Sequence, residues 1–496
     1  MKLSPTATTP LPIGPSASSF HVPWKALVPI ALGALILLFP TPEGLQPYAW
    51  QFFALFVAVI AALILEPIPT AAIGLIGVSV AAGLMLVPGK PDVAATPGDG
   101  IRFALSGFSN GTVWLIFTAY MFSLGYEKTG LGRRVALALI KLLGKRTLGL
   151  GYAVAIADLA VAPFTPSNTA RSGGIIFPII KNIPPLYGST PEEGRRKLGA
   201  YLMWTAMVTT CVTSSMFLTA LAPNLLALEI LQKTSKLSVT WTEWFVALAP
   251  ACIVLFLLMP YVVYVLYPPE VKQSEGAPQW AGAELAKMGA ISRKEWTMGA
   301  LAVAALLLWI FGGKQFDATT VALLGLCAMV LTGVIGWDDV IGHKTAWNVL
   351  VWFATLVAMA DGLAKVGFLS WFAKGAAASM SGFSIVALVI GFVLLFYFIH
   401  YMFASLTAHT TALLPVVLAT VGTVAGMPMK ELALLLCGTL GLMGILTPYA
   451  TGPSPIYYGC GYISRKEYWT LGSVFGLIFI VVYLAIGYPW MMALQP

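Results

Sequence analysis

Residues 162–182 read APFTPSNTARSGGIIFPIIKN, a polar turn that is broken by prolines and set inside apolar sequence. Its two leading prolines end the arriving helix, while Ser167, Asn168 and Thr169 are residue types that begin a new one. A helix over residues 167–181 would cover only roughly 21 Å of about 30 Å of hydrocarbon, so we expect a re-entrant hairpin. Its tip would present hydroxyls, an amide and helix N-terminal N–H groups to an anion. An ordinary cytoplasmic loop is the alternative, and the apolar runs close on both sides disfavour it.

The composition is that of a membrane protein. Of the 496 residues, 58% are hydrophobic and 10% charged, and the mean hydropathy is +0.86. These values exclude an ordinary soluble domain, so we expect an all-α polytopic protein of the lipid bilayer. Residues 1–24 are rich in Pro, Ser and Thr, lack a signal-peptide pattern and are expected to form a disordered tail.

Cysteines and charges exclude several other classes. The five cysteines are scattered without a C-x-x-C pair, so no disulfide framework, metal site or cofactor is expected. The net charge of +8 is not gathered in one patch, so we expect no nucleic-acid partner.

The Lys and Arg residues indicate how the chain is oriented in the membrane. With a cytoplasmic N-terminus and hairpins that return to their own side, 19 Lys and Arg lie inside and 8 outside, as the positive-inside rule requires. The C-terminus then lies outside, and a bacterial inner membrane is the expected location.

The two halves of the chain are related by a nearly constant offset. A second polar turn at residues 403–415, FASLTAHTTALLP, repeats the first and enters from the opposite face by the topology count. We therefore predict an inverted repeat with two re-entrant helical hairpins. The matched pairs, at offsets of 237 or 238 positions, are Trp114 and Trp352, Lys128 and Lys365, Gly130 and Gly367, Ser167 and Ser405, Thr169 and Thr407, and Arg171 and His409.

A broken transmembrane helix is predicted after each hairpin. Residues 219–224 interrupt an apolar run in the first half, and residues 447–455, TPYATGPSP, interrupt one in the second. Paired interruptions in an inverted repeat indicate a transporter site at the repeat interface. The many hydroxyls at 209–219 are typical of helix packing, so Thr219 and Asn224 at the break are the candidates there.

The motifs S-N-T-A-R at 167–171, S-L-T-A-H at 405–409 and TPYATGPSP resemble the divalent anion/sodium symporter (DASS) family, over nearly the whole chain. The likeness is greatest to its citrate:succinate and tartrate:succinate antiporters and its 2-oxoglutarate/malate translocators. This resemblance implies a homodimer in which a scaffold holds an elevator-type transport domain, with substrate carboxylates between the two S-x-T tips. With the breaks included, the candidate substrate-binding residues are Ser167, Asn168, Thr169, Ser405, Leu406, Thr407, Thr447, Pro448, Thr219 and Asn224.

One departure from the sodium-coupled members of that family is informative. Their second motif is also S-N-T, whereas Leu406 stands here at the amide position and removes an oxygen ligand from a sodium site. Arg171 and His409 follow the two serines by four residues, where a positive group could compensate substrate charge, as in the exchanger branch. The alternatives are a snorkelling arginine and a histidine that hydrogen-bonds to a neighbouring hydroxyl. No role is assigned to Asp158, Asp361 or Glu66.

The predicted organisation has five parts. They are a tail (1–24), scaffold spans with an interfacial helix (25–146), the first transport-domain hairpin with its broken helix (147–242), a connecting span with the central cytoplasmic loop and a second scaffold part (243–382), and the second hairpin, broken helix and last span (383–496).

These features predict sodium-independent exchange of di- or tricarboxylates such as succinate, malate, 2-oxoglutarate, tartrate or citrate. If Arg171 and His409 leave the empty carrier with uncompensated charge, only the loaded carrier crosses readily. Sodium- or proton-coupled uptake of the same anions is the alternative. A hydrolase using Ser167 or Ser405 with His409 would lack an orienting carboxylate, so no enzymatic activity is expected. A channel fits the paired broken helices less well.

Overall fold

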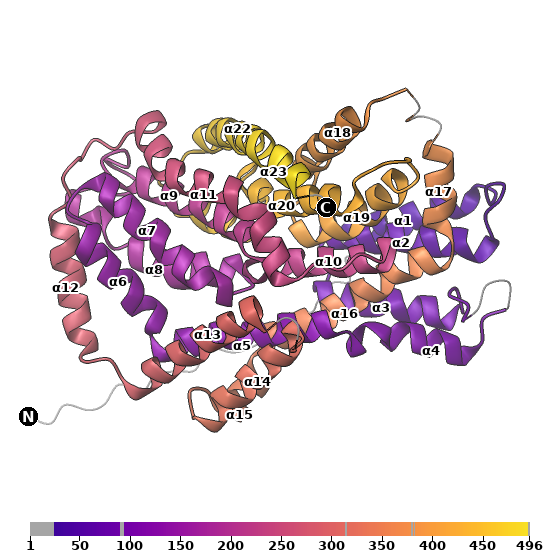
Figure 1. The fold of residues 1–496 in the computed structure, drawn as a ribbon, viewed down its shortest axis with the longest axis horizontal. Coiled ribbons are helices and arrows are strands. Elements are labelled where there is room, and N and C mark those ends of the chain that lie inside the picture. Colours follow the sequence, from indigo (N-terminus) through magenta and orange to yellow (C-terminus); the bar gives the residue numbers. More distant parts are fainter. Residues whose placement is uncertain (1–23, 90–93, 313–314, 378–379, 381, 495–496) are drawn as a thin grey trace, which may run out of the picture.

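The computed structural model describes residues 24–89, 94–312, 315–377, 380 and 382–494, and within them it contains helices and no strand (Figure 1). The predicted disordered tail lies outside the described residues except for Trp24, which begins the first helix. The α-helices are α1 (Trp24–Leu38), α2 (Pro47–Leu65), α3 (Thr70–Gly83), α4 (Pro97–Leu105), α5 (Gly111–Thr129), α6 (Leu131–Leu143), α7 (Thr147–Val161), α8 (Phe177–Ile180), α9 (Gly199–Met216), α10 (Ala222–Ser235), α11 (Trp241–Leu266), α12 (Gly276–Met288), α13 (Arg293–Phe311), α14 (Ala318–Leu331), α15 (Trp337–Gly342), α16 (Lys344–Lys365), α17 (Phe368–Ala377), α18 (Ile385–Phe398), α19 (Leu406–Val421), α20 (Met429–Leu442), α21 (Pro453–Gly459), α22 (Arg465–Val482) and α23 (Tyr488–Ala493).

Among the described residues, seven helical stretches are long and apolar enough to cross a membrane. Two of them lead into the predicted turns, one through α7 and the other through α18. Together with the composition, these helices make the chain a multi-pass membrane protein. The seven stretches are Pro47–Leu65, Thr147–Phe164, Trp241–Leu266, Arg293–Phe311, Lys344–Lys365, Ile385–Met402 and Arg465–Ala493.

The predicted repeat is visible in the order of the elements. In the first half α7 passes into a 3₁₀ turn, η2 (Ala162–Phe164), and then into the first polar tip. In the second half α18 passes into the 3₁₀ turn η7 (Ile399–Met402) and then into the second tip, which begins α19. Both predicted turns are therefore confirmed as helix, tight turn and new helix at the offset found in the sequence.

Two glycines mark a further equivalent joint in the repeats. Gly130 joins α5 to α6 with a φ of 75°, and Gly367 joins α16 to α17 with a φ of 84°. This left-handed backbone is open to glycine at little cost, which explains why both halves carry glycine where a long helix bends into a shorter one.

The two broken helices are also confirmed. The first break separates α9 from α10 and contains the short 3₁₀ turn η5 (Leu218–Ala220). The second separates α20 from α21, with the 3₁₀ turn η8 (Met443–Ile445) followed by residues 446–452. Each break frees backbone groups that a continuous helix would use internally. At the first break, side chains of Asn224 and Arg171 donate to the freed carbonyls of Ser214 and Ala220.

The helix after the first tip differs from the expected α-helix. Residues Thr169–Ile176 form a π-helix, η3, which continues into the single α-helical turn of α8. The wider π turn falls on Gly173 and Gly174, and Pro178 in α8 has no N–H with which to make a regular backbone bond. The second tip lacks this glycine pair and begins an ordinary α-helix.

Two groups of apolar side chains form the interior, and α19 belongs to both. The smaller group gathers side chains of α2, α3, α4, α16 and α17, and Ala408 of α19 packs with it. The larger group includes α7, α9, α11 and α20, and Leu414 and Leu418 of α19 pack with it. The second tip is thus carried on a helix that lies between two separate cores.

Hydrogen bonds to the first half hold the segment that connects the two halves at both of its ends. At its start, Thr147 donates its backbone N–H to the carbonyl of Lys272 at 3.0 Å. At its end, Arg134 of α6 donates to the carbonyl of Gly289 at 3.0 Å and to the carboxylate of Glu295 at 2.5 Å. The segment predicted as a polar loop therefore contains α12, which is fastened along α6.

Candidate functional site

A single pocket of about 240 Å³ brings the two predicted tips together. Its lining includes the S-x-T residues of both halves: Ser167, Asn168, Thr169, Ser405, Leu406 and Thr407. The other lining residues are Glu66, Tyr120, Pro166, Leu221, Ala222, Pro223, Trp352, Phe353, Ala404, Thr451 and Gly452. Segments that lie 238 positions apart in the chain therefore form one cavity.

The two serines hold the tips in the same way. The hydroxyl oxygen of Ser167 accepts the backbone N–H of Ala170 at 3.1 Å, and that of Ser405 accepts the N–H of Ala408 at 3.3 Å. Each serine therefore caps the helix that follows it, as the sequence predicted. The equivalence of these contacts shows that the repeat extends to the local hydrogen bonding of the tips.

Helix N-termini from three elements reach this pocket. Ala222 and Pro223 begin α10, Leu406 and Thr407 begin α19, and Thr169 begins η3, and all five line the pocket. The helix dipole is positive at each N-terminus. At α10 the N–H of Ala222 already donates to the carbonyl of Pro166 at 2.7 Å and Pro223 has no N–H, so these two residues contribute no free amide. No Lys or Arg is found among the described lining residues, and Glu66 places a carboxylate there, so the attraction for an anion comes from helix N-termini and hydroxyls and is opposed by that carboxylate.

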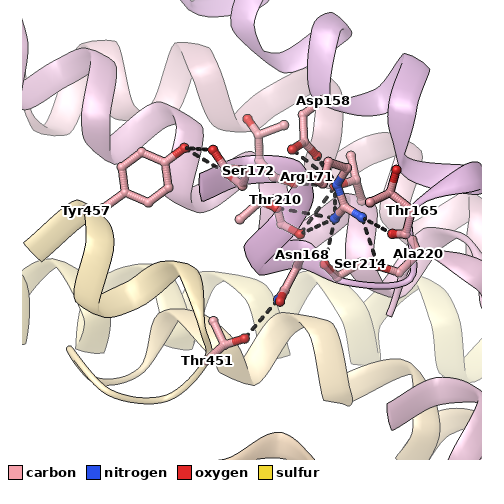
Figure 2. A network of polar contacts seen from close by, with 12 residues as sticks. Asp158, Thr165, Asn168, Arg171, Ser172, Thr210, Ser214, Ala220, Thr451 and Tyr457 are labelled. Atoms are coloured by element: carbon pink, nitrogen blue, oxygen red, sulfur yellow. Dashed lines mark hydrogen bonds and ion pairs between the residues drawn. The ribbon is translucent and has the colours of Figure 1, made fainter. Parts of the chain in front are cut away.

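The second half of the chain braces the first tip. The side-chain amide of Asn168 donates to the hydroxyl of Thr451 at 2.8 Å, and the hydroxyls of Ser172 and Tyr457 are 2.7 Å apart (Figure 2). Both partners come from the second break and the helix after it. Gly452, in the same break, lies so close to Thr169 that a side chain there would overlap the threonine hydroxyl.

Arg171 lies behind the first tip, outside the pocket lining, and is completely buried. Its Nε donates to both carboxylate oxygens of Asp158 at 3.2 Å (Figure 2). The expectation that Arg171 leaves an uncompensated positive charge in the empty site is therefore wrong, because Asp158 neutralises it. Asp158, to which the sequence analysis assigned no role, pairs with the guanidinium and offsets the free-energy cost of burying its charge.

The other guanidinium N–H groups of Arg171 bind the segments around the first break. Both terminal nitrogens are used, and the acceptors include three main-chain carbonyls and three hydroxyls. This network fixes the first tip to α9 and η5, which is a structural role for the arginine. The acceptors are the carbonyls of Thr165 and Ala220, the carbonyl of Thr210 at 3.5 Å, and the hydroxyls of Thr210, Thr213 and Ser214.

His409 also lies behind its tip and is completely buried. Its ring contacts those of Phe396, His400 and Phe403, with centroid separations of 4.3, 5.0 and 5.1 Å. Neither ring nitrogen has a hydrogen-bond partner among the described residues. The alternative reading, that His409 bonds to a neighbouring hydroxyl, is therefore wrong, because the hydroxyls of Thr410 and Thr411 bond to carbonyls of their own helix.

The four candidates at the breaks lie outside the pocket lining. Thr219 donates to the carbonyl of Pro163 at 2.5 Å, and Asn224 donates to the carbonyl of Ser214 at 2.8 Å. Thr447 is buried, and Pro448 beside it is half-buried. These side chains hold the breaks in shape, while Leu221, Ala222, Pro223, Thr451 and Gly452 supply the walls.

Several lining residues had no signal in the sequence. Glu66 ends α2 in a left-handed conformation with a φ of 47°, and Tyr120 comes from α5. Trp352 was noted only for its repeat partner, and it lines the pocket together with Phe353. Nothing local in these stretches distinguishes them from scaffold, because their place at the site depends on how α2, α5 and α16 pack.

Two larger pockets occupy equivalent places in the two repeats. One, of about 770 Å³, lies between the α5–α6 joint, α12 and the far end of the first hairpin helix, near Ile179. The other, of about 430 Å³, lies between the α16–α17 joint and the far end of α19, near Leu418. Neither contains a tip residue, so they are clefts beside the hairpins and separate from the pocket at the tips.

No cluster of three or more His, Cys, Asp or Glu side chains within the described ranges could hold a metal ion. The chemistry available at the tip pocket is that of hydroxyls, one amide, the Glu66 carboxylate and helix N-termini. The hydroxyls, the amide and the N-termini are suited to binding anions by hydrogen bonds.

Solved transporter structures share this fold. The chain aligns with the YdaH transporter of Alcanivorax borkumensis at 18% identity and a TM-score of 0.51, covering 91% of this chain and 99% of the other. It aligns with MtrF of Neisseria gonorrhoeae, from a class of antimetabolite efflux pumps, at 16% identity and a TM-score of 0.55, covering 95% and 98%. At these identities the likeness concerns the fold alone.

Relatives found by sequence comparison are much more similar to this chain than these solved structures. A citrate/succinate antiporter of Escherichia coli K12 is 48% identical over 475 residues, which cover 94% of this chain and 97% of that protein. An L-tartrate/succinate antiporter of Shigella sonnei is 47% identical over 477 residues, which cover 94% and 98%. Residues 21–495 match the model of the sodium:sulfate symporter transmembrane region. The resemblance drawn from the turn motifs is thereby confirmed, and the chain belongs to the sodium:sulfate symporter family, that of the divalent anion/sodium symporters.

Proposed function

We propose that this protein is a secondary active transporter that exchanges di- or tricarboxylates across the membrane without sodium. The observation that carries this proposal is the tip pocket, where two S-x-T turns and the N-termini of three helical elements face one cavity. Such a cavity offers hydrogen-bond donors at two places, one for each carboxylate of a short diacid. The names of the relatives, antiporters of succinate with citrate or tartrate, support the same class of substrate.

The second tip favours exchange over sodium-coupled uptake. Leu406 lines the pocket where the sodium-coupled pattern has an asparagine, so its side chain offers no oxygen to a cation. Sodium- or proton-coupled symport of the same anions remains the alternative function, and it shares the pocket and the tips with exchange.

A hydrolase has less support. The hydroxyls of Ser167 and Ser405 accept backbone N–H groups at their own helix starts, and neither is hydrogen-bonded to His409. A serine nucleophile needs a base in contact with its hydroxyl, and this site provides none.

For transport we propose an elevator movement within a homodimer. The moving body would contain the two hairpins and the broken helices (147–242 and 383–496), and the scaffold would contain 25–146 and 243–382. The equivalent clefts beside the two hairpins support this division, because each leaves room next to an α5–α6 or α16–α17 joint.

Reconstituted vesicles test the exchange directly. We expect uptake of labelled succinate only when the vesicles contain an unlabelled dicarboxylate or citrate, at a rate that does not change when sodium is replaced by choline. Substrate identity follows from counterflow against a panel of succinate, malate, 2-oxoglutarate, tartrate and citrate. Robust uptake into empty vesicles that increases with sodium would contradict exchange and support symport.

Alanine at either tip threonine should weaken substrate binding. Thr169→Ala and Thr407→Ala each remove a hydroxyl from the pocket, and loss of one buried donor costs about 1–3 kcal/mol of binding free energy. Succinate affinity of the purified variants measures the effect. Thr420→Ala is the matched control, because that hydroxyl bonds to a carbonyl of α19 itself, away from the pocket. Wild-type affinity in both tip variants would remove the threonines from the binding site.

A further inference from the structure

One charged side chain, that of Glu66, is found among the described residues that line the tip pocket. Glu66 is exposed, and its carboxylate makes no hydrogen bond or ion pair within the described ranges. Because the lining there contains no Lys or Arg, helix N-termini and solvent are what balance this negative charge. An anion that enters the pocket therefore meets a carboxylate that has no protein partner of its own.

The backbone holds Glu66 in an unusual conformation at the end of α2. Its φ and ψ are 47° and 57°, and its N–H donates to the carbonyl of Ala62 at 2.8 Å. Pro67 follows directly and disfavours the right-handed helical conformation for the residue before it. Glycine would adopt this left-handed backbone at a lower cost, so a glutamate here points to a role for its side chain.

The lining groups of the pocket fall into two chemical kinds. The tips supply hydroxyls and the N-termini of η3 and α19, which suit the carboxylates of a ligand. Helices α2, α5 and α16 supply Glu66 beside the rings of Tyr120, Trp352 and Phe353. An ionised carboxylate only accepts hydrogen bonds, so a ligand that fits Glu66 must bring a donor.

We propose that Glu66 selects hydroxylated dicarboxylates by accepting a hydrogen bond from a hydroxyl on the carbon chain of the ligand. The inference rests on the proposed function, because the carboxylates of the same ligand occupy the tips. Malate and tartrate carry such a hydroxyl. Succinate and 2-oxoglutarate, when ionised, carry only acceptors, so they offer Glu66 no donor and add like charge beside it.

The size of the pocket makes this difference matter. A ligand in a cavity of about 240 Å³ displaces water that solvates the Glu66 carboxylate. A hydroxyl replaces that water with a hydrogen bond to a charged acceptor, which is stronger than one between neutral groups. A ligand without the hydroxyl leaves the carboxylate poorly solvated next to another anion, and sites built to bind a hydroxyl discriminate against such analogues.

Three ligands of the purified full-length protein test the selection. L-malate and succinate differ by one hydroxyl, and methylsuccinate carries a methyl group in its place, which fills similar space without a donor. Affinities are measured at a pH of about 7.5, where the carboxyls of all three are ionised. We expect the wild type to bind L-malate at least about tenfold more tightly than either of the others.

Glu66→Gln removes the charge and keeps the shape of the side chain. It should bind succinate several-fold more tightly, because the repulsion is gone, and should reduce the preference for malate to about threefold or less, because its acceptor is neutral. Glu66→Asp keeps the charge but is one methylene shorter. It should bind succinate as the wild type does and lose most of the preference, which separates hydrogen bonding from repulsion.

Glu127→Gln is the matched control. Glu127 is also exposed, and it lines the cleft of about 770 Å³ beside the first hairpin and not the tip pocket. The same change of charge there should leave all three affinities at their wild-type values.

The outcomes separate this inference from the proposed function. Equal affinities of the wild type for malate and succinate, methylsuccinate binding as tightly as malate, or an unchanged preference in Glu66→Gln would each overturn the role of Glu66 and leave exchange standing. Failure of the wild type to bind any of the five acids of the panel would overturn both. The comparison of the three ligands can overturn the inference with the wild type alone, even if a variant does not fold.

Discussion

Asp158→Asn is expected to destabilise the protein by about 3–5 kcal/mol, which is the usual cost of removing one partner of a buried ion pair. Arg171 is completely buried, and Asp158 is the carboxylate that pairs with it. Without the Asp158 carboxylate the guanidinium of Arg171 keeps its uncharged hydrogen-bond acceptors but has no oppositely charged partner. The network that holds the first tip is therefore weakened. The thermal unfolding midpoint in detergent and the yield of folded protein measure the effect.

The second repeat offers a matched control for this substitution. Asp361→Asn removes a carboxylate that is 2.7 Å from Lys365, whose side chain is 53% exposed, so the loss should be below about 1 kcal/mol. Combining Asp158→Asn with Arg171→Gln should recover part of the lost stability, because no buried charge is then left alone. Equal destabilisation by the two aspartate substitutions would show that the Arg171 pair is not a support of the fold.

Gly452→Ala is expected to reduce exchange about 100-fold or more. A methyl group at this position would overlap the hydroxyl of Thr169 and would press on its Cβ, so the first tip must move away from the second break. A shift of about 1 Å in a positioning element is enough for a loss of this size. The initial rate of succinate exchange per reconstituted protein gives the measurement.

Gly459→Ala is the control, because a Cβ there meets open space in the same part of the chain. It should retain exchange close to the wild-type rate. If Gly452→Ala also exchanged normally, the close contact between the break and Thr169 would have no part in transport. Unfolding midpoints of both variants separate a local effect at the tip from a loss of stability.

The features that could be predicted from the sequence are those with a local signal. Prolines, capping residues and short helix lengths located both turns and both breaks, and the offset between Ser167 and Ser405 revealed the repeat. Once the turns are known to be equivalent, the pairing of their tips follows from symmetry. The six S-x-T residues accordingly lie at one pocket.

The features that were missed depend on packing between distant segments. Asp158 is one of several polar residues in an apolar helix, and only the folding back of the turn places it beside Arg171. Thr219 and Asn224 looked like ligands because they occur at a break, but their side chains satisfy carbonyls instead, Thr219 that of Pro163 in η2 and Asn224 that of Ser214 in α9. The π-helix at the first tip was also missed, because it depends on contacts with other segments that no local sequence pattern shows.

The bracing of the first tip by the second half constrains how this protein can change over evolutionary time. Asn168 and Thr451 are 283 positions apart, and Ser172 and Tyr457 are 285 apart, yet each pair shares a buried hydrogen bond. A substitution on one side leaves the other without its partner, so the two repeats are not free to diverge independently at these positions. The two halves are therefore complementary, because neither half contains the whole lining of the tip pocket or both partners of these hydrogen bonds.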